Sequence, residues 1–390
     1  MNKLMSDKIK KTVRLIVIMA GVAAFIVAVV RFYSIEKTEM VSTKGYYYES
    51  ARVTEVVKDN LNSDGVRVGY QLLKVEILSG DYKGEVLEAT SAEGNLFGAI
   101  CKQNDRIIVT MSVSGDNKTV SVYSKDRTVQ VCVFVGIFML LICVIGGRNG
   151  IKSVAGLAFT VVAIIYIYLQ MIYVGFSPFG AAVLIAAVTT IVTMYLIGGY
   201  SIKTFCAITG TVTGVLVAGV SAWIFGIAAD IDGYNVSNIE TLTFVGQNTE
   251  IQIGGLLFSG ILIASLGAVM DVAMSVSSAI CEIKDKSPSL TWQQLFKSGM
   301  NVGRDMMGTM SNTLILAFVG SSASTLIINY AYDLPFRQII NSYNIGIEIM
   351  QGVAGSIGVI LTVPIVAIIT AVLLSVKYNK TGETVKNNKG

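Results

Sequence analysis

The sequence predicts an α-helical polytopic membrane protein with about eight spanning helices and a small all-β, OB-like extracytoplasmic domain. Hydrophobic residues make up 53% of the 390-residue chain and charged residues only 14%, whereas soluble globular domains carry about 25% charged residues. The mean hydropathy is +0.64. In addition, apolar runs long enough to cross ~30 Å of hydrocarbon as helices recur along most of the chain. These observations place most of the chain in lipid.

Residues 1–34 are predicted to form an N-terminal cytoplasmic tail and a spanning anchor. Basic residues precede an apolar run from Leu15 to Val30, a pattern shared by signal peptides and uncleaved anchors. The run ends in Arg31, Phe32 and Tyr33 rather than in the small residues of a cleavage site. We therefore interpret it as an anchor whose N-terminus is cytoplasmic.

Residues 35–127 are predicted to form the extracytoplasmic β domain. Turn signals such as Ser79-Gly80-Asp81 separate five alternating runs, YYYESARVTEVV, VRVGYQLLKVEIL, GEVLEAT, DRIIVTMSV and KTVSVYS. Five strands at this spacing indicate a small barrel of OB type. Such barrels often bind oligonucleotides or sugars, yet only Tyr46, Tyr47 and Tyr48 form an aromatic cluster here. A structural or docking module is therefore the favoured interpretation.

Residues 128–377 are predicted to form a seven-helix bundle, and residues 378–390 a basic cytoplasmic tail. Gly and Pro interrupt several of the apolar runs, which membrane helices tolerate when neighbours satisfy the freed backbone groups. The predicted spans are 129–146, 151–174, 179–198, 204–229, 252–280, 306–330 and 345–376. Between the fifth and sixth of these, KDKSPSLTWQQLFKSGMNVGRD is predicted to form a short interfacial helix with Ser287 as its N-cap and Pro288 at its first position.

The basic residues predict the orientation of the spans. Eight spans that start inside put both termini in the cytoplasm, and the loops alternate accordingly. The outer loops after the β domain hold only Arg337, whereas the predicted cytoplasmic segments hold Arg148, Lys152, Lys203, Lys284, Lys286, Lys297, Arg304, Lys377, Lys380, Lys386 and Lys389. The sequence thus predicts a multi-pass protein of the bacterial plasma (cytoplasmic) membrane with its β domain outside.

The sequence lacks the residues that several classes of function require. The chain has no histidine, the commonest general base and metal ligand, and its five cysteines include no CxxC pair. It contains no Walker A motif, and its 30 basic residues form no aromatic-interleaved stripe for nucleic acid. We therefore expect no enzyme, no catalytic residue, no metal, no cofactor and no nucleic-acid partner.

Asp271 is the clearest polar residue inside a predicted span. A charged side chain there costs at least ~2.5 kcal/mol and usually faces a protein interior, a cavity or a partner. The positions that share its helical face are small or hydroxylic: Gly260, Ala264, Gly267, Ser275 and Ser278. Such a stripe lets another helix, or a file of water and ions, approach the carboxylate.

Two further polar stripes lie on the last two predicted spans. Asp305 and Asn312 enter from the same inner side as Asp271, while Glu348 and Gln351 lie nearer the outer face, above Pro364. We hypothesise that Asp271, Asn312, Glu348, Ser275 and Gln351 line a transport path, and that Gly267, Arg304, Asp305 and Pro364 serve packing or gating. The structural alternative is that Asp271 only fixes helix packing through a hydrogen bond.

Three segments resemble the YibE/F family of multi-spanning bacterial membrane proteins: GGLLFSGILIASLGAVMDVAMSVSSAICEI, GMNVGRDMMGTMSNTLILAFVGSS and QGVAGSIGVILTVPIVAII. The length and the β domain resemble the longer, YibE-type members, whose relatives include shorter partners without the domain. The resemblance implies that Asp271, Arg304, Asp305 and Asn312 lie in characteristic stretches, and that the partner is a paired shorter member or a second copy. Members are described only as membrane proteins or permeases.

Two functions are compatible with these features. The leading hypothesis is a membrane transport protein or permease component that moves a small solute or ion. The alternative is a non-transporting scaffold or envelope-assembly protein that engages a partner through its outer β domain. A water-filled cavity that reaches the carboxylates favours transport, and an exposed groove on the β domain favours the scaffold.

Overall fold

The chain folds into two compact units, which we describe separately. The computed structural model describes residues 30, 35, 37–42, 44–63, 65–92, 99–115, 117–236 and 238–387, with side chains up to residue 377 in the last helix. One unit covers residues 39–144, and the other covers residues 145–390 together with the first 38. The predicted anchor at 15–30 lies outside the described residues, apart from Val30.

The first unit contains a closed five-stranded barrel. The strands lie in the order β1-β2-β3-β5-β4, β1 also pairs with β4, and only the β3–β5 pair is parallel. The strands are β1 (Tyr46–Lys58), β2 (Gln71–Ile77), β3 (Val86–Ser91), β4 (Arg106–Ser114) and β5 (Asn117–Lys125). Each strand coincides with one of the five predicted runs, so the prediction of a small β barrel is confirmed.

Alternation of apolar and polar residues builds this barrel. In β2, every second residue from Gln71 to Ile77 is buried, because successive side chains of a strand point to opposite faces. Val53, Leu73 and Met111 are completely buried in the interior. On the outside, Lys74 pairs with Glu55 across two strands at 2.8 Å. The inward set supplies the hydrophobic stabilisation.

A buried amide closes one end of the barrel. Gln71 is 1% exposed; its Nε2 donates to Asp59 Oδ1 at 2.8 Å, and its Oε1 accepts from the Cys101 amide at 2.8 Å. Arg67 donates to the same Asp59 oxygen at 2.6 Å. The hydrogen bonds from Arg67 and Gln71 hold the pKa of Asp59 below its ordinary value. This network ties the β1–β2 connection to the barrel.

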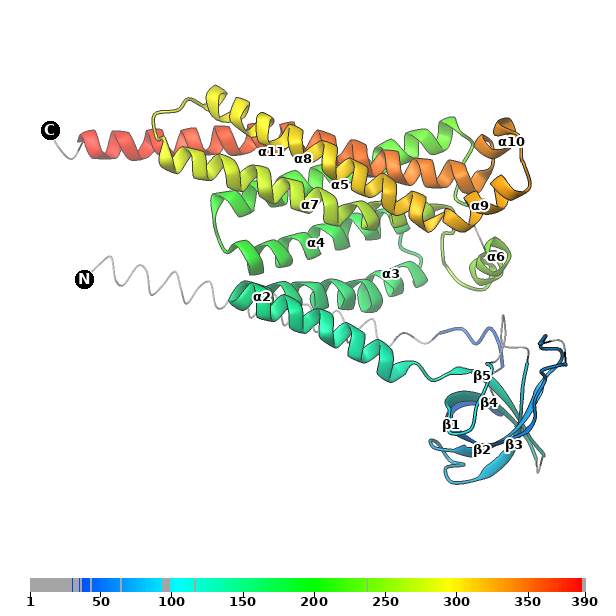
Figure 1. Ribbon diagram of the computed structural model, residues 1–390. Coiled ribbons are helices and arrows are strands. Elements are labelled where there is room, and N and C mark those ends of the chain that lie inside the picture. Colours follow the sequence, from blue (N-terminus) through cyan, green and yellow to red (C-terminus); the bar gives the residue numbers. More distant parts are fainter. Residues whose placement is uncertain are drawn as a thin grey trace, which may run out of the picture. The chain divides into compact units, whose positions relative to one another are not determined.

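The second unit is a bundle of long helices (Figure 1). Five helical stretches of the described chain are long and apolar enough to cross a membrane, or six if the bent pair α8–α9 is one span. Short helices α6 (Ile239–Asn248) and α10 (Phe336–Ile340) lie in connections. The other helical elements are α2 (Thr128–Ala163), which begins before the division between the units, η1 (Ile164–Tyr168), α3 (Leu169–Tyr173), α4 (Pro178–Gly198), α5 (Ile202–Ala228), α7 (Gly254–Lys286), α8 (Trp292–Ser321), α9 (Ala323–Ala331) and α11 (Tyr343–Asn387).

The boundary between the first two predicted bundle spans falls inside one continuous stretch, Thr128–Tyr173. Gly147 interrupts it with φ 55° and ψ −131°, a left-handed backbone conformation that glycine adopts without steric cost. The stretch therefore consists of two helical segments that meet at Gly147. The two-unit division also falls close to this point, after Val144.

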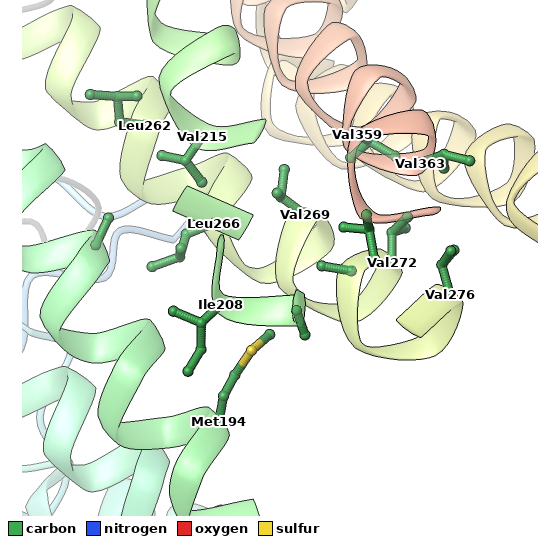
Figure 2. Close-up of a cluster of buried hydrophobic side chains, with 14 of the residues drawn as sticks. Met194, Ile208, Val215, Leu262, Leu266, Val269, Val272, Val276, Val359 and Val363 are labelled. Atoms are coloured by element: carbon green, nitrogen blue, oxygen red, sulfur yellow. The ribbon is translucent and has the colours of Figure 1, made fainter. Parts of the chain in front are cut away.

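Helices α4, α5, α7, α8 and α11 share one hydrophobic core (Figure 2). Ile208, Val269 and Val363 come from three different helices and lie in this core. Helix α5 packs closely on α11, because a methyl group built on Gly210 would overlap Val366, and one on Gly214 would overlap Thr362. Small residues thus allow these two helices to approach closely.

The predicted interfacial helix is wrong in two respects. The helix begins at Trp292, not Pro288, and its N-cap is Thr291, which forms a capping box with Gln294. It also continues without a break to Ser321. Leu295 is fully buried and Gly299 lies against Ile280, so the stretch is the first part of α8 and packs into the bundle.

Candidate functional site

The span predicted at 306–330 is broken. Helix α8 ends at Ser321, α9 begins at Ala323, and the two are bent by 59° at the break. The hydroxyl groups of Ser321 and Ser322 both donate to the carbonyl oxygen of Phe318, at 2.7 and 3.1 Å. Serine hydroxyls that bond to the preceding turn are one of the recognised causes of a bent helix.

A cavity of about 330 Å³ lies where this break faces the beginning of α11. Its lining combines apolar residues with six uncharged or acidic polar ones and includes no lysine or arginine. The lining residues are Val236, Leu257, Ser321, Ser322, Thr325, Asn344, Ile345, Ile347, Glu348 and Gln351. We call it the Glu348 cavity.

Glu348 is the acidic group of this cavity. It lies in the second turn of α11 and is half-buried. Ser321 Oγ lies 3.4 Å from Glu348 Oε2. Because the single proton of this hydroxyl already makes the shorter hydrogen bond to the Phe318 carbonyl at 2.7 Å, most of the acceptor capacity of the carboxylate is free for a ligand. Gln351, one turn further along α11, lines the same cavity. The structure thus brings together two of the predicted path residues.

Sequence reasoning missed Ser321, Ser322, Thr325 and Asn344. A signal was present in the Gly-Ser-Ser sequence at 320–322, since three small or hydroxylic residues in an apolar run are a typical place for a helix to bend. The cavity itself depends on how α8, α9 and α11 pack, which the sequence does not reveal.

Asp271 lies elsewhere, on an exposed stripe of α7. The stripe also contains Gly260, Ala264 and Gly267, all exposed. Outside the glycines' own helical turns, no atom of the described residues lies within 4 Å of a methyl group built on either glycine. Neither the Glu348 cavity nor the apolar cavity described below is lined by Asp271. Ser275, one turn further, is half-buried.

Contacts between helices fix the level of Asp271 in the bundle. Ile280 of α7 lies against Gly299 of α8, and the two helices are antiparallel, so Asp271 is level with Gly308. Asn312 is one turn further along α8, about 6 Å away along its axis. Met274 lies beside Gly198, the last residue of α4. Asp271 is therefore within about one turn of the α4–α5 end of the bundle.

The structure does not bring Asp271 and Glu348 together. Ser265 of α7 lies beside Gly355 of α11, and these helices run in the same direction (Figure 1). Counting from this contact, the two carboxylates are 13 residues apart in level, about 20 Å at 1.5 Å per residue. They lie towards opposite ends of the bundle.

The remaining predicted residues have separate environments. Arg304, Asp305 and Asn312 are exposed on α8, and none of the ion pairs among the described residues includes Arg304, Asp305 or Asp271. Pro364 lies inside α11, which continues through it as one helix from Tyr343 to Asn387. In the described part of the chain, no cluster of three His, Cys, Asp or Glu side chains is arranged to hold a metal ion.

The model of the family described as YibE/F-like protein matches residues 134–376. The chain belongs to the YibE/F family. The matched region covers the helical bundle, including the α8–α9 break and every predicted site residue, and it begins after the barrel. For this YibE/F protein, neither a curated protein nor a solved structure gives a significant match. Its function must therefore be argued from the site.

Proposed function

We propose that this YibE/F protein is a membrane transport protein or permease component that moves a small solute or ion, and that the Glu348 cavity is its binding site. The observation that carries the proposal is a polar cavity at a broken span. Many secondary transporters bind their substrates where a spanning helix is discontinuous, because the break exposes polar groups at membrane depth. A carboxylate at such a place is a typical feature of an ion or proton path.

The absence of a basic residue from the lining favours a cation or a hydrogen-bond donor as the bound group. Glu348 can supply the charge, while Ser321, Ser322 and Gln351 supply oxygen atoms. We further propose that Asp271, Ser275 and Asn312 form the other end of the path, with Gly267, Arg304, Asp305 and Pro364 in packing or gating roles.

Flux in proteoliposomes tests this function. Purified protein is compared with Glu348→Gln and Asp271→Asn across a panel of cations and small solutes, and Thr213→Val serves as a control at an exposed position of α5. We expect native flux that falls at least tenfold in Glu348→Gln. A folded native protein without flux under any condition would contradict the transport function.

We propose eight spans with both termini in the cytoplasm and the barrel outside the plasma membrane. The stretch Thr128–Tyr173 has 46 residues, about 69 Å as a straight helix, more than twice the ~30 Å of hydrocarbon. Counting it as two spans that meet at Gly147, and α8–α9 as one, gives eight with the predicted anchor. The distribution of Lys and Arg supports the orientation. Labelling of a cysteine introduced at Asn388 from outside intact cells would contradict it.

We also propose that the barrel has the OB fold. The order β1-β2-β3-β5-β4, closed by β1–β4 pairing and with β3 parallel to β5, supports this proposal.

A second function, a scaffold that binds a partner through the barrel, is favoured by one feature. Tyr48 and Tyr123 are 64% and 61% exposed and lie edge to face at 5.5 Å. Loss of a co-purifying partner in Tyr48→Ser, together with the absence of flux from the folded native protein, would support the scaffold.

We propose that a second copy of the chain covers the exposed polar face of α7 and α8. This face carries Asp271, Asp305 and Arg304, and lipid cannot solvate them well. Because it holds both signs of charge, a two-fold axis can place each Arg304 against an acid of the other copy. A paired shorter family member is the alternative occupant.

A further inference from the structure

A second cavity adjoins the Glu348 cavity and has a different chemical character. It has a volume of about 200 Å³ and is lined almost entirely by apolar groups. Its lining residues are Ile315, Phe318, Val319, Ser322, Leu326, Ile345, Glu348, Ile349, Gly352 and Val353. The two cavities share Ser322, Ile345 and Glu348. A ligand that fills both therefore passes the Glu348 side chain.

The apolar cavity is open at the side of the bundle. Val319, Ile349 and Val353 line it and are still 48%, 39% and 46% exposed. These residues belong to the spans α8 and α11, whose outer surfaces face hydrocarbon in a membrane. An apolar chain can enter this cavity from the lipid, while a polar head group reaches the serine and carboxylate oxygens beyond it.

The charge of the shared site points to the sign of the head group. Glu348 is an acidic residue, and neither lining includes a lysine or arginine to balance it. A half-buried charge without a counter-ion is only partly solvated, so a cationic ligand head would supply the missing charge. An anionic head would be repelled by Glu348.

We propose that the substrate is a small cationic amphiphile, with an ammonium-type head in the Glu348 cavity and an aliphatic portion in the apolar cavity. This inference rests on the proposed transport function and specifies its substrate class. The ligand enters laterally from the lipid, and the apolar cavity selects for its aliphatic portion. A molecule with the head alone fills only the polar half of the site and binds more weakly.

Equilibrium dialysis with the full-length protein in phosphatidylcholine nanodiscs tests the proposal. The probes are hexyltrimethylammonium, tetramethylammonium and hexyl sulfate, with empty nanodiscs as the correction for partition into lipid. We expect saturable binding of hexyltrimethylammonium at least tenfold tighter than that of the other two. Glu348→Gln should lower this affinity at least tenfold.

Two variants separate the contribution of the ligand's head group to binding from that of its aliphatic portion. Val353→Trp fills the apolar cavity. It should lower the affinity for hexyltrimethylammonium at least tenfold and leave the affinity for tetramethylammonium unchanged. Val372→Trp is the matched control, because Val372 lies on the same helix, is 43% exposed and lines neither cavity. Val372→Trp should bind both probes as the native protein does.

The outcomes distinguish this inference from the proposed function. Equal affinity for the two ammonium probes, together with Glu348-dependent flux of simple cations, would overturn the amphiphile and leave transport in place. Displacement of the hexyl probe by phosphatidylethanolamine would assign the site to a bilayer lipid and also overturn it. If neither binding nor flux depends on Glu348, both proposals are wrong.

Discussion

Asp59 shows how one carboxylate of the barrel depends on its neighbours. Its Oδ1 accepts hydrogen bonds from Arg67 Nη1 and Gln71 Nε2, and Gln71 in turn holds the backbone of Cys101. The ionised form is therefore favoured in the folded state, and its pKa is lowered. Its contribution to stability is present above the unfolded-state pKa and is lost as the pH falls through the lowered folded-state pKa.

We therefore expect Asp59→Asn to loosen the β1–β2 connection at neutral pH, and to differ less from the native protein as the pH falls below about 4, the ordinary range for an aspartate. Hydrogen–deuterium exchange of the 59–71 segment, compared between the two proteins at each pH, measures this. Asp126→Asn is the control, since the Asp126 carboxylate accepts from the Thr128 amide at the start of α2 and lies outside the 59–71 segment. A difference that stays constant down to pH 3 would contradict the role of the charge.

At the scale of elements, the close packing of α5 against α11 is the feature most sensitive to side-chain size. Gly214 leaves no room for a methyl group, because this group would overlap Thr362 and lie 2.8 Å from Val269 Cγ1. Helix α11 of this pair also carries Glu348, which lines the cavity from the second turn of the helix. A shift of α11 would thus affect both the core and the site.

We expect Gly214→Ala to destabilise the protein by about 1–3 kcal/mol, the usual cost of overpacking a core, seen as a lower thermal midpoint in detergent. Gly136→Ala is the matched control in α2, since its added methyl group meets no atom of the described residues within 4 Å outside its own helical turns. Adding Thr362→Ala to Gly214→Ala should recover part of the loss. Equal midpoints for the two glycine variants would show that the helices can move apart freely.

The break between α8 and α9 combines element geometry with function. The 59° bend turns Ser321 and Ser322 toward the start of α11, so the bend and the cavity arise together. Removing both hydroxyls leaves the backbone free to continue as one helix. The element, rather than any one residue, therefore determines whether the site exists.

At the scale of the whole molecule, the exposed polar face of α7 and α8 predicts self-association. We expect Arg304→Asp to weaken association of the purified protein at least tenfold, because it places like charges on both sides of the interface. The double variant Arg304→Asp with Asp305→Arg should restore it, since the pairing is reversed on both copies. Light scattering of the purified protein over a range of concentrations measures both effects.

Lys152→Asp is the control for net charge, because Lys152 is exposed on another helix, α2. A native protein that is monomeric at every concentration, or that associates only when a shorter family member is present, would exclude the second copy as the occupant. Equal weakening by Lys152→Asp would indicate a general charge effect.

Much of the fold could be predicted because its signals are local. Alternation over six to thirteen residues specifies the strands, and apolar length specifies the spans, so the barrel and the membrane class follow from the sequence. Gln71 is the exception inside the barrel: its alternation places it inward, but only the fold shows that Asp59 and Cys101 satisfy it. The site was predictable only in part, since Glu348 and Gln351 were foreseen and Ser321 and Ser322 were not.

The sequence by itself determined the membrane class, the strands, most helix positions and the family, because hydropathy, periodicity and short sequence motifs are properties of neighbouring residues. Only the tertiary structure decided that α8 breaks at Ser321, that this break meets Glu348, and that Asp271 stays on an exposed stripe about 20 Å from it in level. These features depend on the rotation and register of helices against one another. Contacts between residues far apart in the chain, such as Ser265 with Gly355, set that rotation and register.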